Sequence, residues 1–256
     1  FFLFLLCLVL IPDIGKTAGG STRWLSFFGR DIQPAEFYKL FYIIWLCAYL
    51  DNNRDRIKKA EVFIVPFLWL FISSILLMMQ PDFGSTVTIF YMTLIMLFIA
   101  KARFIYLTLV SALGLLGAYL IVMNFEYIRK RLDFFEPCKD AFGDGYQLCY
   151  SLMAIGSGSI FGKGLGASTS KLFFLPEAHT DFIFAILAEE LGIFGIIFVI
   201  LLFYLFLSKC ISIGDKAIRV GLVFQGYIAY AIGIFITSQV LFNMAINLGI
   251  APTKGL

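Results

Sequence analysis

The sequence has 256 residues, of which 61% are hydrophobic and 14% are charged, and its 30 phenylalanines outnumber its 20 lysines and arginines. Soluble domains carry about 25% charged residues, so this composition excludes an ordinary soluble protein and indicates a membrane protein. The formal net charge of +3 comes from scattered basic residues without a basic stripe, which excludes a nucleic-acid-binding protein.

Apolar runs along the chain predict its membrane-spanning helices. The expected runs are residues 1–11, 34–50, 62–80, 84–100, 104–124, 181–208 and 220–248. Helices of this kind cross a hydrocarbon core of about 30 Å, whereas the strands of a barrel would alternate apolar and polar residues. We therefore predict an all-α, polytopic helical membrane protein. The prediction is one membrane domain over residues 1–256, with a long loop at residues 125–180.

Each crossing changes side, so the connections between the runs divide between two faces of the membrane. Face A receives residues 12–33, 81–84, 125–180 and 249–256, and face B receives 51–61, 101–103 and 209–219. The face B connections are short and rich in lysine and arginine, which is typical of cytoplasmic connections. Arg129, Lys130 and Arg131 on face A argue the other way, but long loops follow the charge rule least.

The first polar group of interest lies at the start of the 34–50 run. Pro34 suits the first position of a helix, and Glu36 and Lys39 then stand three residues apart on one side of it. An exposed pair of this kind stabilises a helix by about 0.2–0.5 kcal/mol. Near an apolar boundary such a pair normally turns towards other helices or a wet cavity. A structural pair and a functional pair are both compatible with these residues.

The long face A loop contains the glycine-rich segment GSGSIFGKGLGAS with Lys163. A Walker phosphate loop is excluded, because Ser157 occupies the position of its first glycine and Gly164 follows the lysine. Backbone flexibility is the favoured explanation of the glycines, and an anion-binding nest is the alternative. His179 has no cysteines near it in the sequence, so no metal ligand is assigned.

Two cysteines, Cys138 and Cys149, lie in the same loop. They could form a disulfide if the loop faces an oxidising compartment, because disulfides persist in such compartments. The sequence leaves their pairing open.

Three acidic residues follow in DFIFAILAEELG, at the beginning of an apolar run and inside it. Thr180 suits a helix N-cap and Asp181 suits the first turn, where the helix dipole favours a carboxylate by about 0.3–1 kcal/mol. Capping does not explain Glu189 and Glu190, because ionisable groups within a span are costly and usually functional. Successive residues differ by about 100° around a helix, so we expect the two glutamates to face different neighbours and one of them to have a cationic partner.

Taken together, these stretches resemble the SEDS family of bacterial cell-wall polymerases, which comprises the FtsW, RodA and SpoVE proteins. The resemblance runs through RWLSFFGRDIQPAEFYKL, QPDFGSTVTIF, GDGYQLCYSLMAIGSG, GKGLG, KLFFLPEAHTDFIFAILAEELG and APTKGL, and it is closer to the division members than to the elongation members. It implies a ten-span fold, of which this chain holds about seven spans. The implied activity is polymerisation of lipid II, the undecaprenyl-pyrophosphate disaccharide peptide, into peptidoglycan at the extracytoplasmic face of the bacterial cytoplasmic membrane.

The resemblance also implies roles for individual residues. The essential aspartate of the family falls on Asp181, which would act as the general base of an inverting transfer, and its conserved ion pair falls on Glu36 and Lys39. Membrane lipids, a class B penicillin-binding transpeptidase and other division proteins are the implied partners, and a divalent cation is an open alternative as cofactor. The remaining substrate-binding candidates are the polar face A residues Arg129, Arg131, Lys163, Lys171, Glu177, His179 and Lys254.

Two departures from the family pattern stand out. Residues 135–138 read FEPC where family members commonly have a Trp-Asn-Pro-Trp-like stretch, and the chain ends after PTKGL, before the last span of the family. We therefore expect a fragment of a longer protein.

A rival hypothesis is a transporter, or flippase, for the lipid-linked precursor that uses Glu189 and Glu190. A transporter should show chemical features at both faces and often two related halves. Face B shows little beyond charge, and the sequence has no evident internal repeat. A scaffold that only positions a transpeptidase is the third hypothesis, and it would tolerate the loss of Asp181. The sequence favours the polymerase.

Overall fold

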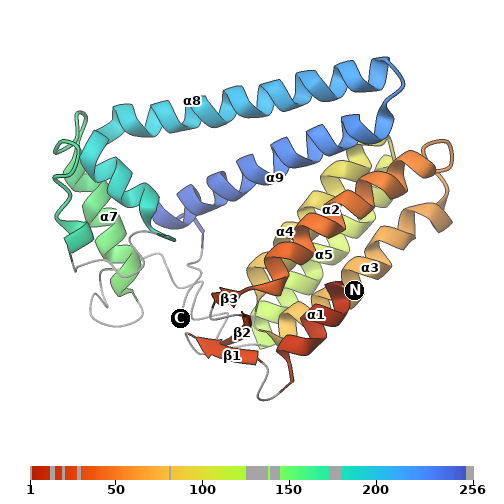
Figure 1. Ribbon diagram of the computed structural model, residues 1–256, viewed down its shortest axis with the longest axis horizontal. Helices are drawn as coiled ribbons and strands as arrows, with labels where there is room; N and C mark the ends of the chain where they lie inside the picture. The colour runs from red at the N-terminus through yellow and green to blue at the C-terminus, as the bar shows by residue number, and fades with distance from the viewer. Residues whose placement is uncertain are drawn as a thin grey trace. The chain divides into compact units, whose positions relative to one another are not determined.

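The computed structural model, drawn in Figure 1, describes residues 2–11, 15–18, 21–27, 30–80, 82–124, 138, 145–172 and 180–251. Most of these residues are helical. The helices are α1 (Phe2–Val9), α2 (Pro34–Asn52), α3 (Ala60–Met79), α4 (Phe83–Ile99), α5 (Phe104–Asn124), α7 (Tyr146–Gly158), α8 (Ile183–Arg219) and α9 (Val223–Asn247), with a 3-10 turn η2 (Ser170–Leu172). Every predicted apolar run forms a helix, so the helical fold class is confirmed.

Helices α3, α8 and α9 are each long and apolar enough to cross a membrane, and α4 and α5 contain shorter apolar stretches. The end of α8 differs from the prediction. The connection predicted at residues 209–219 is helical, and the turn on face B is confined to residues 220–222. The reason is that Lys216 and Arg219 stand in the last turn of α8, where cations favour the C-terminal end of a helix.

The connection at residues 12–33 contains a small sheet that the sequence pattern did not predict. Strands β1 (Gly15–Ala18), β2 (Ser21–Phe27) and β3 (Arg30–Ile32) pair antiparallel in the order β1-β2-β3. Strands of 4, 7 and 3 residues are too short to give a clear alternating signal. Arg23 of β2 donates from Nε to the main-chain oxygen of Gln80 at 3.0 Å, which ties the sheet to the end of α3.

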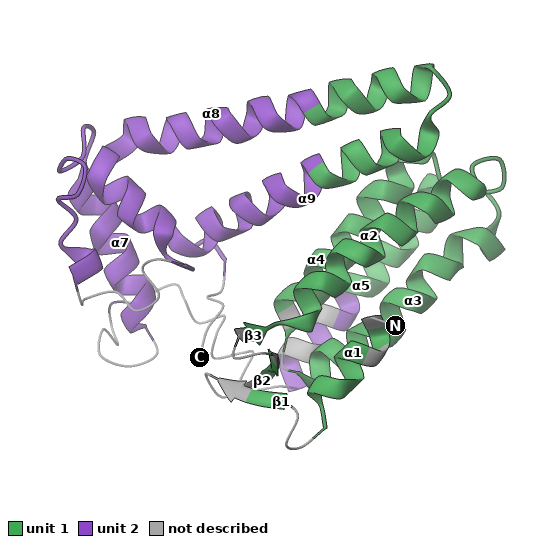
Figure 2. Cartoon of the chain, viewed as in Figure 1, with its two compact units in different colours: residues 1–115, 210–232, 255–256 green, residues 116–209, 233–254 purple. Residues whose placement is uncertain are grey.

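The chain forms two compact units, which Figure 2 colours separately. Unit 1 comprises residues 1–115, 210–232 and 255–256, and unit 2 comprises residues 116–209 and 233–254. Helices α5, α8 and α9 each contribute residues to both units. The assignment of one membrane domain to residues 1–256 stays a prediction.

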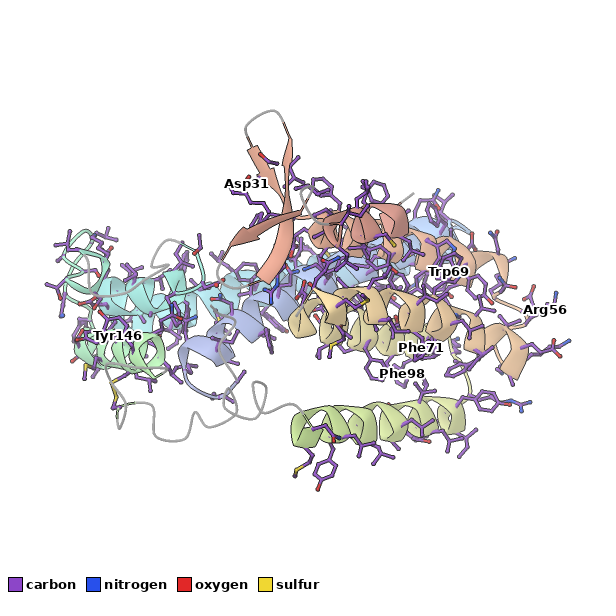
Figure 3. All side chains as sticks on the ribbon, turned by 90° about the horizontal axis from the view of Figure 1, so that it is seen from below. Asp31, Arg56, Trp69, Phe71, Phe98 and Tyr146 are labelled. Atoms are coloured by element: carbon purple, nitrogen blue, oxygen red, sulfur yellow. A yellow bond between two sulfur atoms is a disulfide. The ribbon has the colours of Figure 1, made fainter. Side chains whose placement is uncertain are left out.

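The helix bundle of unit 1 is apolar both in its interior and on its surface. Helix α2 packs against α1 and α4, and α3 packs against α4, around fully buried side chains such as Leu77 and Met92. On the same helices Trp69, Phe71 and Phe98, labelled in Figure 3, are exposed. A helix that is apolar all round suits a protein core or a membrane span. Because these residues are exposed, the pattern agrees with lipid around the bundle.

Two tyrosine hydroxyls of α2 bond to α3 around its internal proline, and one of them replaces the hydrogen bond that the proline removes. Pro66 has no N–H group to donate to the carbonyl of Val62, one turn earlier in the helix. The Tyr49 hydroxyl donates to that carbonyl at 2.9 Å, and the Tyr42 hydroxyl donates to the Pro66 carbonyl at 3.1 Å. No water is available in hydrocarbon to satisfy such groups. These bonds therefore fix α2, which carries Glu36 and Lys39, against α3.

Candidate functional site

Asp181 lies half-buried in the turn that immediately precedes α8. The sequence predicted Asp181 in the first turn of the helix. The helix begins at Ile183, so Asp181 instead lies two residues before the first helical residue. Its main-chain carbonyl oxygen accepts hydrogen bonds from the Nδ2 atoms of Asn243 and Asn247 in α9, at 2.9 and 3.0 Å. The adjacent Phe182 is buried in an apolar cluster of unit 2. Packing and hydrogen bonds therefore both hold the turn.

Asn247 also caps the start of α8. Its Oδ1 accepts the N–H of Ala185 at 3.1 Å, the kind of bond that the sequence predicted from Thr180. Asn247 is fully buried, and its main-chain oxygen accepts a hydrogen bond from Ser151 Oγ of α7 at 3.0 Å. Sequence reasoning missed Asn243 and Asn247. The available signal was two amides one helical turn apart in an apolar run, since polar side chains in a span usually bond to other helices.

Glu189 is fully buried in α8, and the segment after α7 surrounds its carboxylate with donors. Lys163 Nζ lies 2.6 Å from Oε1, and Ser168 Oγ donates to Oε2 at 2.6 Å. The Thr169 hydroxyl and the Ser170 amide donate to the same carboxylate at 3.1 and 3.3 Å. A buried charge is tolerated when it is paired and hydrogen-bonded in this way.

Glu190 faces the same segment as its neighbour. Lys171 Nζ lies 2.6 Å from Glu190 Oε1, and the Ser168 amide donates to that oxygen at 3.4 Å. The expectation that the two glutamates face different neighbours is therefore wrong, and both of them have a cationic partner. The angle of about 100° between them still holds. We call residues 159–172 the docking loop. This loop contacts both carboxylates because it bends around α8.

Glycines allow the end of α7 and the docking loop to approach α8 this closely. A Cβ atom on Gly158 would lie 2.1 Å from the carbonyl oxygen of Ala188, and one on Gly162 would lie 2.1 Å from that of Glu190. Gly192 has a φ of +64° and interrupts α8, and the Ile193 amide donates to Ser159 at 3.2 Å instead of within the helix. Close packing, rather than the flexibility favoured from the sequence, explains Gly158 and Gly162, whereas a Cβ atom on Gly156, Gly164 or Gly166 would meet open space.

The ion pairs bear on two of the predicted substrate-binding residues. The ammonium groups of Lys163 and Lys171 are each held by a glutamate, and their side chains are 35% and 25% exposed. Each lysine would have to share its charge between the glutamate and a phosphate group. Their contact with substrate stays a prediction.

The predicted pair of Glu36 and Lys39 is confirmed in unit 1. Lys39 Nζ lies 2.7 Å from Glu36 Oε1, with the lysine side chain 6% exposed and the glutamate side chain 53% exposed. The glutamate thus extends from a largely buried lysine towards the surface of the unit. Glu36 also stands in the first turn of α2, where the helix dipole favours a carboxylate.

We expect Glu36→Ala to lower the stability of the full-length protein as well as its activity. The change leaves the Lys39 ammonium without its carboxylate, and because Glu36 is half exposed the loss should be about 1 kcal/mol, or roughly 2–4 °C in Tm. Asp31→Ala, which breaks the exposed pair with Lys16, is the matched control and should leave Tm unchanged. Lost activity at unchanged Tm would instead indicate that Glu36 contacts the substrate.

The other predicted site residues, Arg129, Arg131, Glu177, His179 and Lys254, lie outside the described residues. Within the described ranges, no group of three His, Cys, Asp or Glu side chains is placed to hold a metal ion.

The Cys138–Cys149 disulfide, left open from the sequence, is formed. It joins Cys138 to Cys149 in the first turn of α7, within unit 2.

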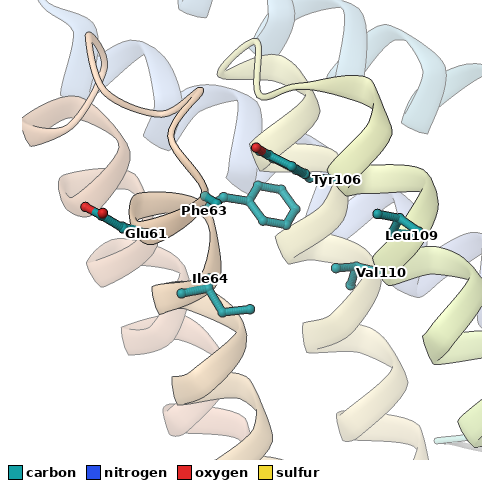
Figure 4. A pocket seen from close by; sticks show the side chains of 7 residues that line it. Glu61, Phe63, Ile64, Tyr106, Leu109 and Val110 are labelled. Carbon is teal, nitrogen blue, oxygen red and sulfur yellow. The ribbon is translucent and has the colours of Figure 1, made fainter.

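Unit 1 contains a groove whose lining is mainly apolar, unlike the hydrogen-bonded turn that carries Asp181. It has a volume of about 420 Å³ and lies between the starts of α3 and α5, lined mainly by side chains such as Phe63, Ile64, Leu109 and Val110 (Figure 4). Sugar sites need several polar groups at defined positions. The groove is therefore a poor candidate for binding the carbohydrate part of a substrate.

Comparison with known sequences gives a match along the whole chain. The family model for FtsW, RodA and SpoVE proteins, described as "Cell cycle protein", matches residues 1–256. The probable peptidoglycan glycosyltransferase FtsW of Thioalkalivibrio sulfidiphilus is 43% identical over 99% of this chain and 64% of its own length. The protein of that name from Methylococcus capsulatus is 41% identical over 98% of this chain and 64% of its own. The chain thus spans a little less than two thirds of these relatives.

Solved structures share the fold. A chain of the structure described as "Structural coordination of polymerization and crosslinking by a peptidoglycan synthase complex" aligns over 100% of this chain and 70% of its own, with a TM-score of 0.78 and 24% identity. The rod shape determining protein RodA of Thermus thermophilus aligns over 98% of this chain and 65% of its own, with a TM-score of 0.63 and 24% identity. The match of the family model over every residue establishes that the chain belongs to the family of FtsW, RodA and SpoVE cell cycle proteins.

Proposed function

We propose that the full-length protein is a peptidoglycan glycosyltransferase that polymerises lipid II during cell division, with Asp181 as the general base. The observation that carries the proposal is the position of Asp181, half-buried in a fixed turn at the N-terminal end of α8, in a chain 41–43% identical to relatives named as probable peptidoglycan glycosyltransferases. Glu189 and Glu190 are each paired with a lysine, which makes them poor candidates for the base.

The chemistry places specific demands on this carboxylate. The acceptor 4-hydroxyl attacks C1 of the donor sugar, the new bond from oxygen to C1 forms with inversion, and the bond from C1 to the pyrophosphate oxygen breaks. Asp181 takes the proton of the attacking hydroxyl, and the pyrophosphate leaves with the bonding electrons. A base must lie within hydrogen-bond reach of the hydroxyl. A carboxylate at the end of a membrane-spanning helix can contact sugars that a lipid anchor holds at the membrane surface.

The departing pyrophosphate needs positive charge near it. Arg129, Lys130 and Arg131 are candidates from the sequence, with Lys163 and Lys171 as further ones if they share their charge with the glutamates. A divalent cation bound by the pyrophosphate would supply the same electrostatic stabilisation. Glu36 and Lys39 are the proposed additional contacts in unit 1.

We place face A, and therefore Asp181, on the extracytoplasmic side of the bacterial cytoplasmic membrane. The Cys138–Cys149 disulfide in the long connection supports this side, since disulfides form and persist in oxidising compartments. The basic connections on face B support a cytoplasmic location for that face.

A class B penicillin-binding transpeptidase is the proposed partner. The support is the likeness of fold to a chain of a solved peptidoglycan synthase complex in which polymerization and crosslinking are coordinated. The transporter hypothesis needs Glu189 and Glu190 in a polar pathway. Their ion pairs with the docking loop count against it.

The test of the proposed function is polymerisation of purified lipid II by the purified full-length protein, with and without its transpeptidase partner. Glycan strands longer than the disaccharide should form, and the partner should increase their yield. Movement of lipid II across vesicle membranes without any glycan product would contradict the proposal and favour the transporter.

A further inference from the structure

Two amides of α9 converge on one atom of the proposed base. Asn243 and Asn247 both donate through Nδ2 to the main-chain oxygen of Asp181, at 2.9 and 3.0 Å. A carbonyl oxygen has two lone pairs, so these bonds use its full capacity. The two asparagines are four residues apart and thus lie on one face of α9. They hold the backbone at position 181 from a single direction.

Asn247 holds both ends of the turn. While its Nδ2 donates to Asp181, its Oδ1 accepts the N–H of Ala185 at 3.1 Å. One planar amide therefore links Asp181, two residues before the first residue of the helix, to Ala185, the third residue of the helix. The donor and the acceptor of an amide lie at a fixed separation. The distance between the Asp181 carbonyl and the first helical turn is consequently set by the geometry of Asn247.

The amide of Asn247 is itself held in place. Its Nδ2 also lies within hydrogen-bond distance of the Asn243 main-chain oxygen, at 2.9 Å, and its main-chain oxygen accepts from Ser151 of α7. Asn247 is 0% exposed, so water does not compete for these bonds. Side chains whose polar atoms are satisfied in a buried site specify one geometry.

Apolar packing already anchors this turn without the amides. Phe182, next to Asp181, is 1% exposed and packs in a cluster with Ala154 of α7 and Ala185. What the asparagine supplies beyond packing is a defined orientation of the backbone that carries the Asp181 carboxylate.

We propose that Asn247, assisted by Asn243, is a positioning residue that orients the base Asp181 towards the acceptor hydroxyl. The inference rests on the proposed function, because it concerns the same carboxylate. A base misplaced by about 1 Å can lose roughly 10²-fold in rate, since proton transfer requires close alignment. The asparagines act through Asp181 and need not touch the substrate.

The test measures kcat, KM and Tm for lipid II polymerisation by full-length protein carrying Asn247→Ala, Asn243→Ala or Asn247→Asp. We expect Asn247→Ala to lower kcat by roughly 10- to 100-fold with KM changed less than about threefold, and Asn243→Ala to lower kcat by about 3- to 10-fold. The matched control is Asn53→Ala, which removes an amide that donates to the Tyr49 carbonyl at 3.0 Å in unit 1. Its kcat should equal that of the wild type.

Asn247→Asp separates positioning from helix capping. An aspartate keeps an acceptor for the N–H of Ala185, but its second carboxylate oxygen faces the carbonyl oxygens of Asp181 and Asn243 in a fully buried site, so kcat should remain low and Tm should fall as well. Recovery of wild-type kcat in Asn247→Asp would reduce Asn247 to a helix cap and overturn the proposal. Wild-type kcat in Asn247→Ala would overturn it as well. If Asn247→Ala does not fold, Asn243→Ala decides, and wild-type kcat in that variant contradicts the proposal.

The same assay distinguishes this inference from the proposed function. Inactive Asp181→Asn with fully active asparagine variants would leave Asp181 as the base and remove only the positioning role. Fully active Asp181→Asn would refute the proposed base, and the positioning role with it.

Discussion

Asp181→Asn is expected to lower the rate of lipid II polymerisation by about 10²- to 10⁴-fold, which is the usual contribution of a general base. The amide has nearly the same shape as the carboxylate but cannot take a proton from the acceptor hydroxyl. Because the turn is held through the main-chain oxygen of Asp181, which the substitution keeps, folding should be unaffected. Single-turnover assays with the full-length protein, with Tm measured in parallel, check both expectations.

The control for this substitution is Asp55→Asn, the same acid-to-amide change at an exposed position on face B. It should leave both rate and Tm at wild-type values. A large drop in Tm for Asp181→Asn would mean that the side chain supports the fold. A rate within about threefold of wild type would exclude it as the base.

Glu189→Gln should produce the largest loss of stability among the predicted substitutions. It removes a buried negative charge that Lys163, Ser168, Thr169 and Ser170 surround with donors. Breaking a fully buried pair costs about 3–5 kcal/mol, and because Lys163 is 35% exposed we expect about 2–3 kcal/mol here. Tm should fall by roughly 4–12 °C. The amides of residues 168–171 should also lose protection in hydrogen exchange.

Glu190→Gln provides the comparison, because this carboxylate has fewer donors and is 14% exposed. The loss of stability in Glu190→Gln should be about half of that in Glu189→Gln. Equal stability of wild type and Glu189→Gln would contradict the docking of the loop on this carboxylate.

Lys163→Met separates the two roles considered for the lysine. If Lys163 serves mainly to neutralise Glu189, the effects of Lys163→Met and Glu189→Gln on the free energy of unfolding should be non-additive. A double-mutant cycle should then give a coupling energy of about 0.5–3 kcal/mol. A loss of polymerisation with unchanged Tm would instead support the predicted contact with pyrophosphate.

The helices could be predicted from the sequence because their signal is local. An apolar run long enough to cross a bilayer is visible without any tertiary information, and Glu36 and Lys39 pair within one turn of the same helix. The end of α8 was misplaced because its last turns are polar and still helical. Basic residues near a helix C-terminus are favourable, so charge alone did not mark the boundary.

The contacts around Asp181 could not be predicted because their partners are far apart in the sequence. Asn243 and Asn247 lie more than sixty residues after the aspartate that they hold. The docking loop likewise reaches Glu189 and Glu190 from 19–26 positions earlier in the chain. Helix angles described the directions of the glutamates correctly, but they carried no information on a loop that bends around the helix at glycines.

The dependence of kcat on pH tests most directly whether Asp181 is the base. In the wild-type protein, kcat for lipid II polymerisation should fall about tenfold per pH unit on the acidic side, as the carboxylate takes up a proton in the enzyme–substrate complex. The residual activity of Asp181→Asn should lack this acidic limb. If the asparagine variant retains the same acidic limb as the wild type, another group is the base and the proposed mechanism is wrong.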